Sequence, residues 1–226
     1  PHVTLIAPGG FERSALVRAI ERAEDLGMIA GVRAQGSDLA EEAFVAELAA
    51  AGVDHVNLLY LSCNADVHDA VIRQGDHATV MRAFDSVRDN EVCVVAEVGL
   101  IEPTLDTLDE TIEALRAADV TNIAFFALAT ATPDREPGAL AGEQLLQTAR
   151  MVEESADALG VRHLWYPPRQ RAAGVALAEQ VRQGPRTSGD HAIRVESDGS
   201  VFVARGPWRS VGNLLNDSWE TMAASE

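Results

Sequence analysis

Hydrophobic and polar positions in the first two thirds of the chain alternate between short apolar runs and longer segments with helical spacing. The apolar runs predict six β-strands, at residues 3–6, 28–32, 55–61, 91–98, 122–128 and 161–166. Helical spacing predicts helices between them, at 14–26, 41–51, 78–88, 105–117 and 142–159. Strands that are apolar throughout are typical of a parallel sheet covered on both sides. The pattern predicts an α/β fold of βα units, arranged as an open sheet or as a partial or full TIM-type barrel.

The pattern changes after Pro168. One helix is predicted at 172–182, and Ile193–Val203 places an Asp-Gly pair between two short apolar runs, which predicts a β-hairpin. We therefore expect a barrel-like domain of residues 1–168 and a small α+β appendage of residues 169–226. The aromatic residues expected to form the appendage's own core are Phe202, Trp208 and Trp219.

Composition and charge exclude several functions. Acidic residues outnumber basic ones 35 to 18, for a net charge of -17, which disfavours nucleic acids and anionic membrane surfaces as partners. All 18 basic residues are arginine, which excludes Schiff-base chemistry, pyridoxal-phosphate anchoring and a phosphate-loop lysine. No apolar stretch reaches the roughly 20 residues of a membrane span, and no signal peptide is visible. We expect a cytoplasmic protein.

The cysteines and histidines predict no metal site. The chain contains only two cysteines, Cys63 and Cys93, too few for an iron–sulfur cluster or a four-cysteine zinc site. A reducing compartment without a disulfide is the simpler interpretation of so few thiols. The six histidines show no metal-ligand spacing such as His-x-x-x-His.

Polar residues and glycines follow several of the predicted strands, where the carboxyl ends of parallel strands usually form a binding site. Each has an ordinary structural interpretation beside the functional one. Glycines after the first strand admit a ligand or merely close a turn. His68 and Asp69, in the loop after the third strand, are a possible proton-transfer pair or simple caps and surface groups. Glu97 and Glu102, around the end of the fourth strand, bind a ligand amine or hydroxyl, or are solvated acids.

The order of four segments resembles the radical S-adenosylmethionine superfamily, in the group with a SPASM-type C-terminal domain. Leu5–Glu12 is similar to its strand ending in Gly-Gly-Glu-Pro, and Arg33–Leu39 to its Thr-Asn-Gly turn. Leu59–Gly75 resembles its Ser-Leu-Asp-Gly, His-Asp and Arg-Gly run, and Ile193–Leu214 its Asp-Gly-Val and Gly-Asn-Ile pattern. The resemblance implies a partial barrel that binds S-adenosylmethionine. The residues it implies for cofactor binding are Gly9, Gly10, Glu12, Gly36, Ser62 and Asn64.

The departures from this family concern its redox chemistry. The Cys-x-x-x-Cys-x-x-Cys loop that holds the family's cluster would precede residue 1. Phe11 stands where the ligand of the methionine amine is expected, and Arg186 and Ala204 stand where appendage cysteines are expected. The resemblance with these departures implies that the family's scaffold is kept, while the cysteine ligands of its clusters are absent from this sequence. S-adenosylmethionine is then the one cofactor still to be considered.

Three functions are compatible with these observations. The first is a non-radical binding or accessory protein in peptide or cofactor maturation, with a small molecule, a peptide or a partner protein as its ligand. The second is a fragment of an active radical enzyme whose missing N-terminal segment supplies the cysteines. The third is a cluster-independent α/β-barrel lyase or isomerase with His68, Asp69 and Glu97 as acid–base groups.

Overall fold

The computed structural model describes residues 1–127, 138–140, 142–166, 175–182, 193–203 and 210–223. The chain divides into two compact units, Pro1–Leu164 and Trp165–Glu226. The larger unit carries the parallel sheet, and the smaller unit carries a separate antiparallel sheet.

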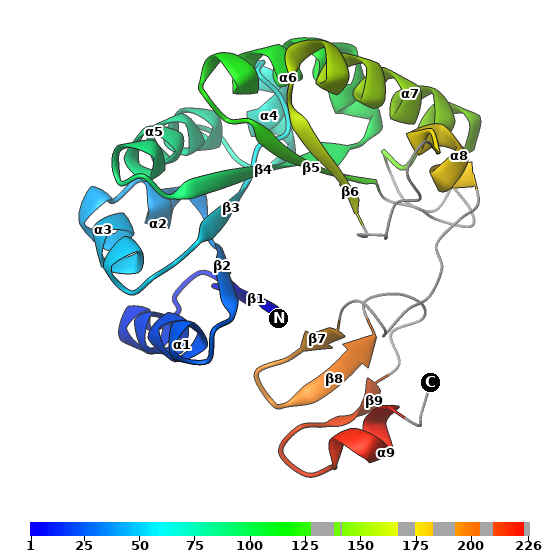
Figure 1. Cartoon of the computed structure of the whole chain (residues 1–226). Coiled ribbons are helices and arrows are strands. Elements are labelled where there is room, and N and C mark those ends of the chain that lie inside the picture. The colour runs from blue at the N-terminus through cyan, green and yellow to red at the C-terminus, as the bar shows by residue number, and fades with distance from the viewer. Residues whose placement is uncertain (128–137, 141, 167–174, 183–192, 204–209, 224–226) are drawn as a thin grey trace. The chain divides into compact units, whose positions relative to one another are not determined.

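Six strands form the larger sheet, and they lie side by side in chain order (Figure 1). They are β1 (His2–Ile6), β2 (Ile29–Arg33), β3 (His55–Leu59), β4 (Cys93–Leu100), β5 (Asn122–Ala127) and β6 (Arg162–Tyr166). The registered pairs from β1 to β5 are all parallel. The predicted α/β fold is confirmed, and the sheet curves into a partial barrel (Figure 1).

Helices connect the strands on the outer side of this curved sheet (Figure 1). They are α1 (Arg13–Asp25), α2 (Gly36–Leu39), α3 (Glu42–Ala50), α4 (Ala65–Val71), α5 (Asp76–Asp89), the 3-10 helix η1 (Glu102–Thr107), α6 (Leu108–Ala117) and α7 (Gly142–Leu159). The short helices α2 and α4 are absent from the sequence prediction. Neither has the length over which apolar periodicity becomes readable.

The two faces of the sheet differ in chemistry because side chains alternate along each strand. The helix-covered face holds the apolar core, which includes Val32, Val56, Leu58, Ala96, Val98, Ile123 and Phe125. Neighbouring positions on the other face include Arg33, Asn57 and Glu97. The apolar strands predicted helices on both faces, but the helices in the described part of this unit follow one face only (Figure 1).

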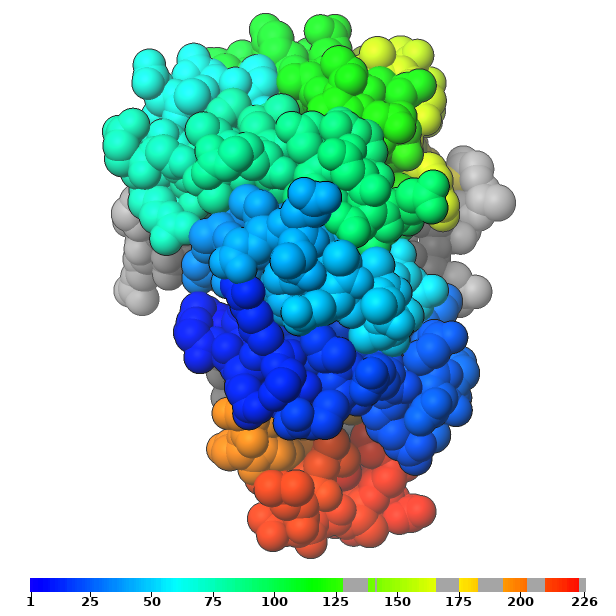
Figure 2. All heavy atoms as spheres, turned by 90° about the vertical axis from the view of Figure 1, so that its left-hand side faces the viewer, coloured from blue at the N-terminus to red at the C-terminus, as the bar shows by residue number. Residues whose placement is uncertain are grey.

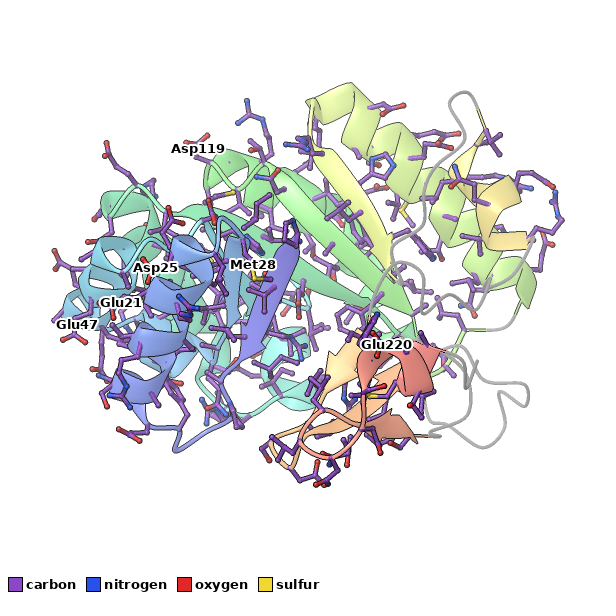
Figure 3. All side chains as sticks on the ribbon, turned by 60° about the horizontal axis from the view of Figure 1, so that its bottom comes forward. Glu21, Asp25, Met28, Glu47, Asp119 and Glu220 are labelled. Carbon is purple, nitrogen blue, oxygen red and sulfur yellow. The ribbon has the colours of Figure 1, made fainter. Side chains whose placement is uncertain are left out.

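Acidic side chains of the helices point outward into solvent. In Figure 2 the atoms of α1, α3 and α5 form the outer surface on this side of the larger unit. Glu21 and Asp25 on α1 and Glu47 on α3 are exposed and point away from the sheet (Figure 3). This placement lets the acidic side chains remain hydrated, so their number gives little information about the polar face of the sheet.

The smaller unit contains the predicted hairpin. Strands β7 (Ile193–Val195) and β8 (Ser200–Val203) pair antiparallel, and β9 (Ser210–Asn213) adds a third strand that the sequence did not predict. Helices α8 (Leu177–Arg182) and α9 (Trp219–Ala223) also belong to this unit.

The core expected for this unit is only partly right. Val201 and Met222 are buried, but Trp219 is 54% exposed, so its predicted place in the core is wrong. Phe202 is half-buried, and Trp208 lies outside the described residues. No helix in the described ranges is both long enough and apolar enough to cross a membrane.

Candidate functional site

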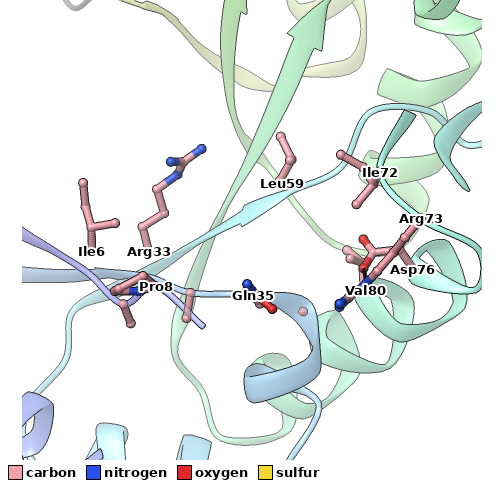
Figure 4. A pocket seen from close by; sticks show the side chains of 12 residues that line it. Ile6, Pro8, Arg33, Gln35, Leu59, Ile72, Arg73, Asp76 and Val80 are labelled. Atoms are coloured by element: carbon pink, nitrogen blue, oxygen red, sulfur yellow. Dashed lines mark hydrogen bonds and ion pairs between the residues drawn. The ribbon is translucent and has the colours of Figure 1, made fainter. Parts of the chain in front are cut away.

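A pocket of about 340 Å³ lies where β1, β2 and β3 end (Figure 4). This is the edge of the sheet at which the sequence predicts binding. Its walls come from the end of β1, the β2–α2 turn, β3, the α4–α5 connection and α5, and they comprise Ile6–Pro8, Arg33–Gly36, Leu59, Ile72, Arg73, Asp76 and Val80.

One buried carboxylate, Glu97 on β4, anchors the polar face of the sheet. Its Oε2 atom accepts a hydrogen bond from Arg33 Nε at 2.6 Å, and its Oε1 atom accepts one from Asn57 Nδ2 at 3.0 Å. Glu97 is 8% exposed and Asn57 is 4% exposed. Asn57 Oδ1 is also buried, and no hydrogen-bond partner for it lies among the described residues. Glu97 thus fixes a guanidinium that lines the pocket, and does not lie free in solvent.

A second buried carboxylate, Asp76 at the start of α5, holds the other side of the pocket. Asp76 Oδ1 accepts from Arg73 Nε at 2.9 Å, and Asp76 Oδ2 lies 3.1 Å from His68 Nε2. The main-chain N–H of Leu61 donates to His68 Nδ1 at 3.1 Å. Because Nδ1 accepts, the ring proton of His68 is on Nε2 and is donated to Asp76. His68 is fully buried and acts on the pocket only through Asp76.

The side chains of His68 and Asp69 have different hydrogen-bond partners, and both residues lie in α4 instead of the predicted loop. Asp69 Oδ2 accepts from the main-chain N–H of Gly75 at 2.6 Å, and Asp69 Oδ1 from that of His77 at 2.9 Å. These main-chain hydrogen bonds hold the pKa of Asp69 below its ordinary value. Asp69 therefore orders the chain that enters α5, which is a structural role.

The polar residues after β3 have structural partners. The Ser62 hydroxyl is buried and shares a hydrogen bond of 2.7 Å with the Thr107 hydroxyl. Asn64 Oδ1 accepts from the main-chain N–H groups of Asp66 and Val67, so Asn64 caps α4. The pocket is lined by neither Ser62 nor Asn64.

The glycines of the predicted site lie at or near the pocket. A Cβ atom on Gly36 would approach Val80 Cγ2 to 2.8 Å, so the absence of a side chain lets α2 pack on α5. A Cβ atom on Gly9 would lie 3.1 Å from Gln35 Nε2, a side chain that lines the pocket. Gly10 has a φ of 81°, which favours glycine in this turn. These contacts explain the glycines without a ligand and leave room for one.

Two residues of the Gly-Gly-Glu-Pro resemblance point elsewhere. Glu12 accepts a hydrogen bond from the Ser14 hydroxyl and lies 3.8 Å from Arg18, at an exposed position. The ring of Phe11 lies 5.8 Å from that of Phe44 on α3. The pocket wall includes neither side chain.

Four polar residues of the site were missed as functional residues by the sequence reasoning. Asn57 gave a signal, because it is an amide within an apolar strand. Arg33 directly follows the predicted second strand, and a polar strand end is a recognisable position. Arg73 falls in the Arg-Gly part of the resemblance, which did not mark it as a site residue. Asp76 gave no signal, since only the packing of α4 against α5 brings it to His68.

The structure holds the two cysteines as free thiols, Cys63 half-buried and Cys93 exposed. Partial desolvation by neighbouring groups raises the pKa of the Cys93 thiol, which lowers its reactivity as a nucleophile. In the part of the chain that the structure describes, no group of three or more His, Cys, Asp or Glu residues is placed to hold a metal ion.

His77 gives the fold a predictable response to pH. Its Nε2 atom lies 3.1 Å from the Tyr60 hydroxyl, whose pKa burial raises to about 12. Burial, with a smaller contribution from His68, lowers the pKa of His77 below 6.5. The unfolded chain then binds more protons just below pH 6.5, so the free energy of unfolding should fall as the pH drops through this window.

Urea unfolding at pH values from about 8 to about 5.5 measures this effect. In a His77→Gln variant, the free energy of unfolding should fall less steeply with decreasing pH. Some pH dependence should remain, because the pKa of His55 is also lowered. A stability that rises on acidification, or a variant with an unchanged slope, would contradict the assignment.

Comparison with solved structures identifies the type of fold. A domain of pyruvate-formate lyase-activating enzyme from Bacteroides vulgatus matches with a TM-score of 0.56 and 15% identity, over 72% of this chain and 97% of that one. A structure of anSMEcpe with bound AdoMet matches with a TM-score of 0.66 and 13% identity, over 98% of this chain. Coproporphyrinogen III oxidase from Escherichia coli, a radical SAM enzyme, matches with a TM-score of 0.50 and 14% identity, over 68% of this chain and 41% of that one.

The chain spans 66% of the length of anSMEcpe. Neither the protein-family models nor the curated protein sequences give a match. Identities of 13 to 15% establish a likeness of fold alone. The chain has a radical S-adenosylmethionine-type α/β fold, followed by a small unit with a three-stranded antiparallel sheet.

Proposed function

We propose that this chain binds a small polar molecule at the ends of β1 to β3 and acts as a non-radical binding or accessory protein. The observation that carries the proposal is the pocket itself, which is lined by two arginines that are each fixed by a buried carboxylate. Convergent polar groups in a preformed pocket are typical of ligand sites. The buried partners on β3 and α4 keep these groups in place.

The residues present do not fit a radical-generating iron–sulfur cluster. Such a cluster needs thiolate ligands, and the 226 residues include only Cys63 and Cys93. The pocket wall contains neither of them. We therefore derive no step of the function from a cluster.

S-adenosylmethionine is the first ligand to test. The structure of anSMEcpe, which has a similar fold, contains bound AdoMet. The pocket offers groups of both signs, the guanidinium of Arg73 and the carboxylate of Asp76, to a ligand that itself carries an ammonium, a carboxylate and a sulfonium. In this proposal Asp76 attracts the cationic groups and Arg73 donates to the carboxylate.

The proposal extends to the setting of the protein. We propose a cytoplasmic accessory role in peptide or cofactor maturation, with the small C-terminal unit as a SPASM-like appendage that contributes to binding of a peptide or partner protein. The hairpin of β7 and β8 supports this comparison, because it coincides with the Asp-Gly segment of the resemblance.

Isothermal titration calorimetry with S-adenosylmethionine tests the proposed ligand. Asp76→Asn should weaken binding about 10-fold or more, because it removes the carboxylate while the amide oxygen still accepts from His68. Asp85→Asn is the matched control, since Asp85 also lies on α5 and pairs with an arginine three residues away, outside the pocket. Absence of binding to the unaltered chain, or equal effects of the two variants, would contradict S-adenosylmethionine as the ligand.

A further inference from the structure

Two arginines line the pocket from different elements. Arg33 extends from the end of β2, and Arg73 comes from the connection between α4 and α5 (Figure 4). Their side chains are 43% and 55% exposed, so solvent or a ligand reaches both. The pocket thus has a guanidinium on each of two walls.

Each arginine is tethered in the same way, through Nε alone. Glu97 accepts from Arg33 Nε at 2.6 Å, and Asp76 accepts from Arg73 Nε at 2.9 Å. No partner for the terminal nitrogens, Nη1 and Nη2, of either arginine lies in the described ranges of the chain. A guanidinium held by Nε keeps its terminal N–H groups for other acceptors, in the planar fork that suits carboxylate and phosphate.

Arg13 shows the contrasting arrangement. Its Nη1 and Nη2 atoms donate to the two oxygens of Glu41 at 2.6 and 2.8 Å, so its fork is closed by the protein itself. This pair joins the start of α1 to the residue before α3, which is a structural role. In the two pocket arginines, the Nη1 and Nη2 atoms that Arg13 uses for its ion pair remain available to a ligand.

Both tethers are anchored in the interior. The side chains of Glu97 and Asp76 are each 10% exposed. Buried Asn57 donates to Glu97 at 3.0 Å, and buried His68 donates to Asp76 across 3.1 Å. Because the guanidinium groups are already fixed, less side-chain entropy is lost when a ligand binds.

We propose that these two forks select a ligand that carries two anionic groups, carboxylates or phosphates, with one group on each arginine. This inference rests on the proposed binding function of the pocket, and it names a class of ligand to which S-adenosylmethionine, with its single carboxylate, does not belong. The net charge of -17 does not oppose it, because Glu97 and Asp76 balance the two arginines locally and salt screens the acids of the outer helices. Recognition then depends on directed N–H groups and not on an excess of positive charge.

Calorimetry with matched pairs of probes tests the inference. Succinate is compared with butyrate, and ADP with AMP, so that each pair differs by one anionic group. We expect the probe with two groups to bind at least about 10-fold more tightly in one of the pairs, since a charge-assisted hydrogen bond contributes about 1.5–3 kcal/mol. A preference in the first pair identifies a dicarboxylate ligand, and a preference in the second a phosphate ligand.

Variants assign the effect to the two forks. Arg33→Gln and Arg73→Gln should each remove the preference for the second group, and Arg33→Lys and Arg73→Lys should restore little of it, because lysine has no fork. Arg13→Gln is the control and should bind like the unaltered chain. Circular dichroism and thermal unfolding of every variant verify that the fold is kept.

The outcomes separate the two proposals. Binding of S-adenosylmethionine with no preference for the second anionic group overturns this inference and leaves the proposed function standing. A preference that survives in both glutamine variants also overturns it. No binding of any probe or of S-adenosylmethionine overturns the inference together with the proposed function. A preference lost in both variants and kept in Arg13→Gln supports it.

Discussion

Replacing His68 by alanine should lower the free energy of unfolding by about 3–5 kcal/mol. The ring of His68 is fully buried, and its removal leaves a cavity beside Tyr60, whose ring centroid lies 5.6 Å away. The same change leaves the N–H of Leu61 and one oxygen of Asp76 without their partner. Urea unfolding, followed by circular dichroism, measures the loss.

The adjacent residue provides the comparison. Asp69→Ala removes two hydrogen bonds from main-chain N–H groups at the start of α5 and an exposed one from the Gln74 side chain. It should cost about 0.5–2 kcal/mol, as for the loss of a helix cap. If His68→Ala kept its full stability, the buried connection between β3 and the pocket would not be structural. A proton-transfer role for His68 and Asp69 would then be the hypothesis to test.

Replacing Phe125 by alanine should cost about 3–5 kcal/mol as well. Phe125 lies on the helix-covered face of β5 and is completely buried. Its neighbour Phe126 points to the opposite face and is half-buried, beside Gly99 of β4. Phe126→Ala should therefore cost less than half as much, because part of that ring is already hydrated.

Thermal or chemical unfolding of the two variants, measured under identical conditions, distinguishes the faces of the sheet. A larger loss for Phe125→Ala than for Phe126→Ala would support the assignment of the core to the apolar layer between the sheet and the helices. Equal losses, or a larger loss for Phe126→Ala, would mean that the polar face also carries core packing, and would count against a ligand site there.

Sequence patterns predicted the large elements well because their physical causes are local. The run from Asn122 to Leu128 and the periodicity of 142–159 are readable without tertiary information, and β5 and α7 appear at these places. The helix α4 was missed because its signal is a single cap, Asn64, followed by one short segment. The third strand β9 was missed because it is only four residues long and contains a glycine.

The candidate site was harder to predict because its side chains meet across the fold. Glu97 was identified as polar at a strand end, but its partners Arg33 and Asn57 come from two other strands. Asp76 lies eight residues from His68, and nothing in that spacing indicates a buried contact. Charge pairing between distant residues depends on register and helix packing, which no local pattern encodes.

Iron and acid-labile sulfide, measured after anaerobic reconstitution of these 226 residues, test the central claim most directly. We expect iron and sulfide far below one cluster per chain and no brown colour, because these residues contain too few thiolates to build the cluster. A stoichiometric cluster of four irons and four sulfides, with its visible absorption, would contradict the proposal of a non-radical binding protein.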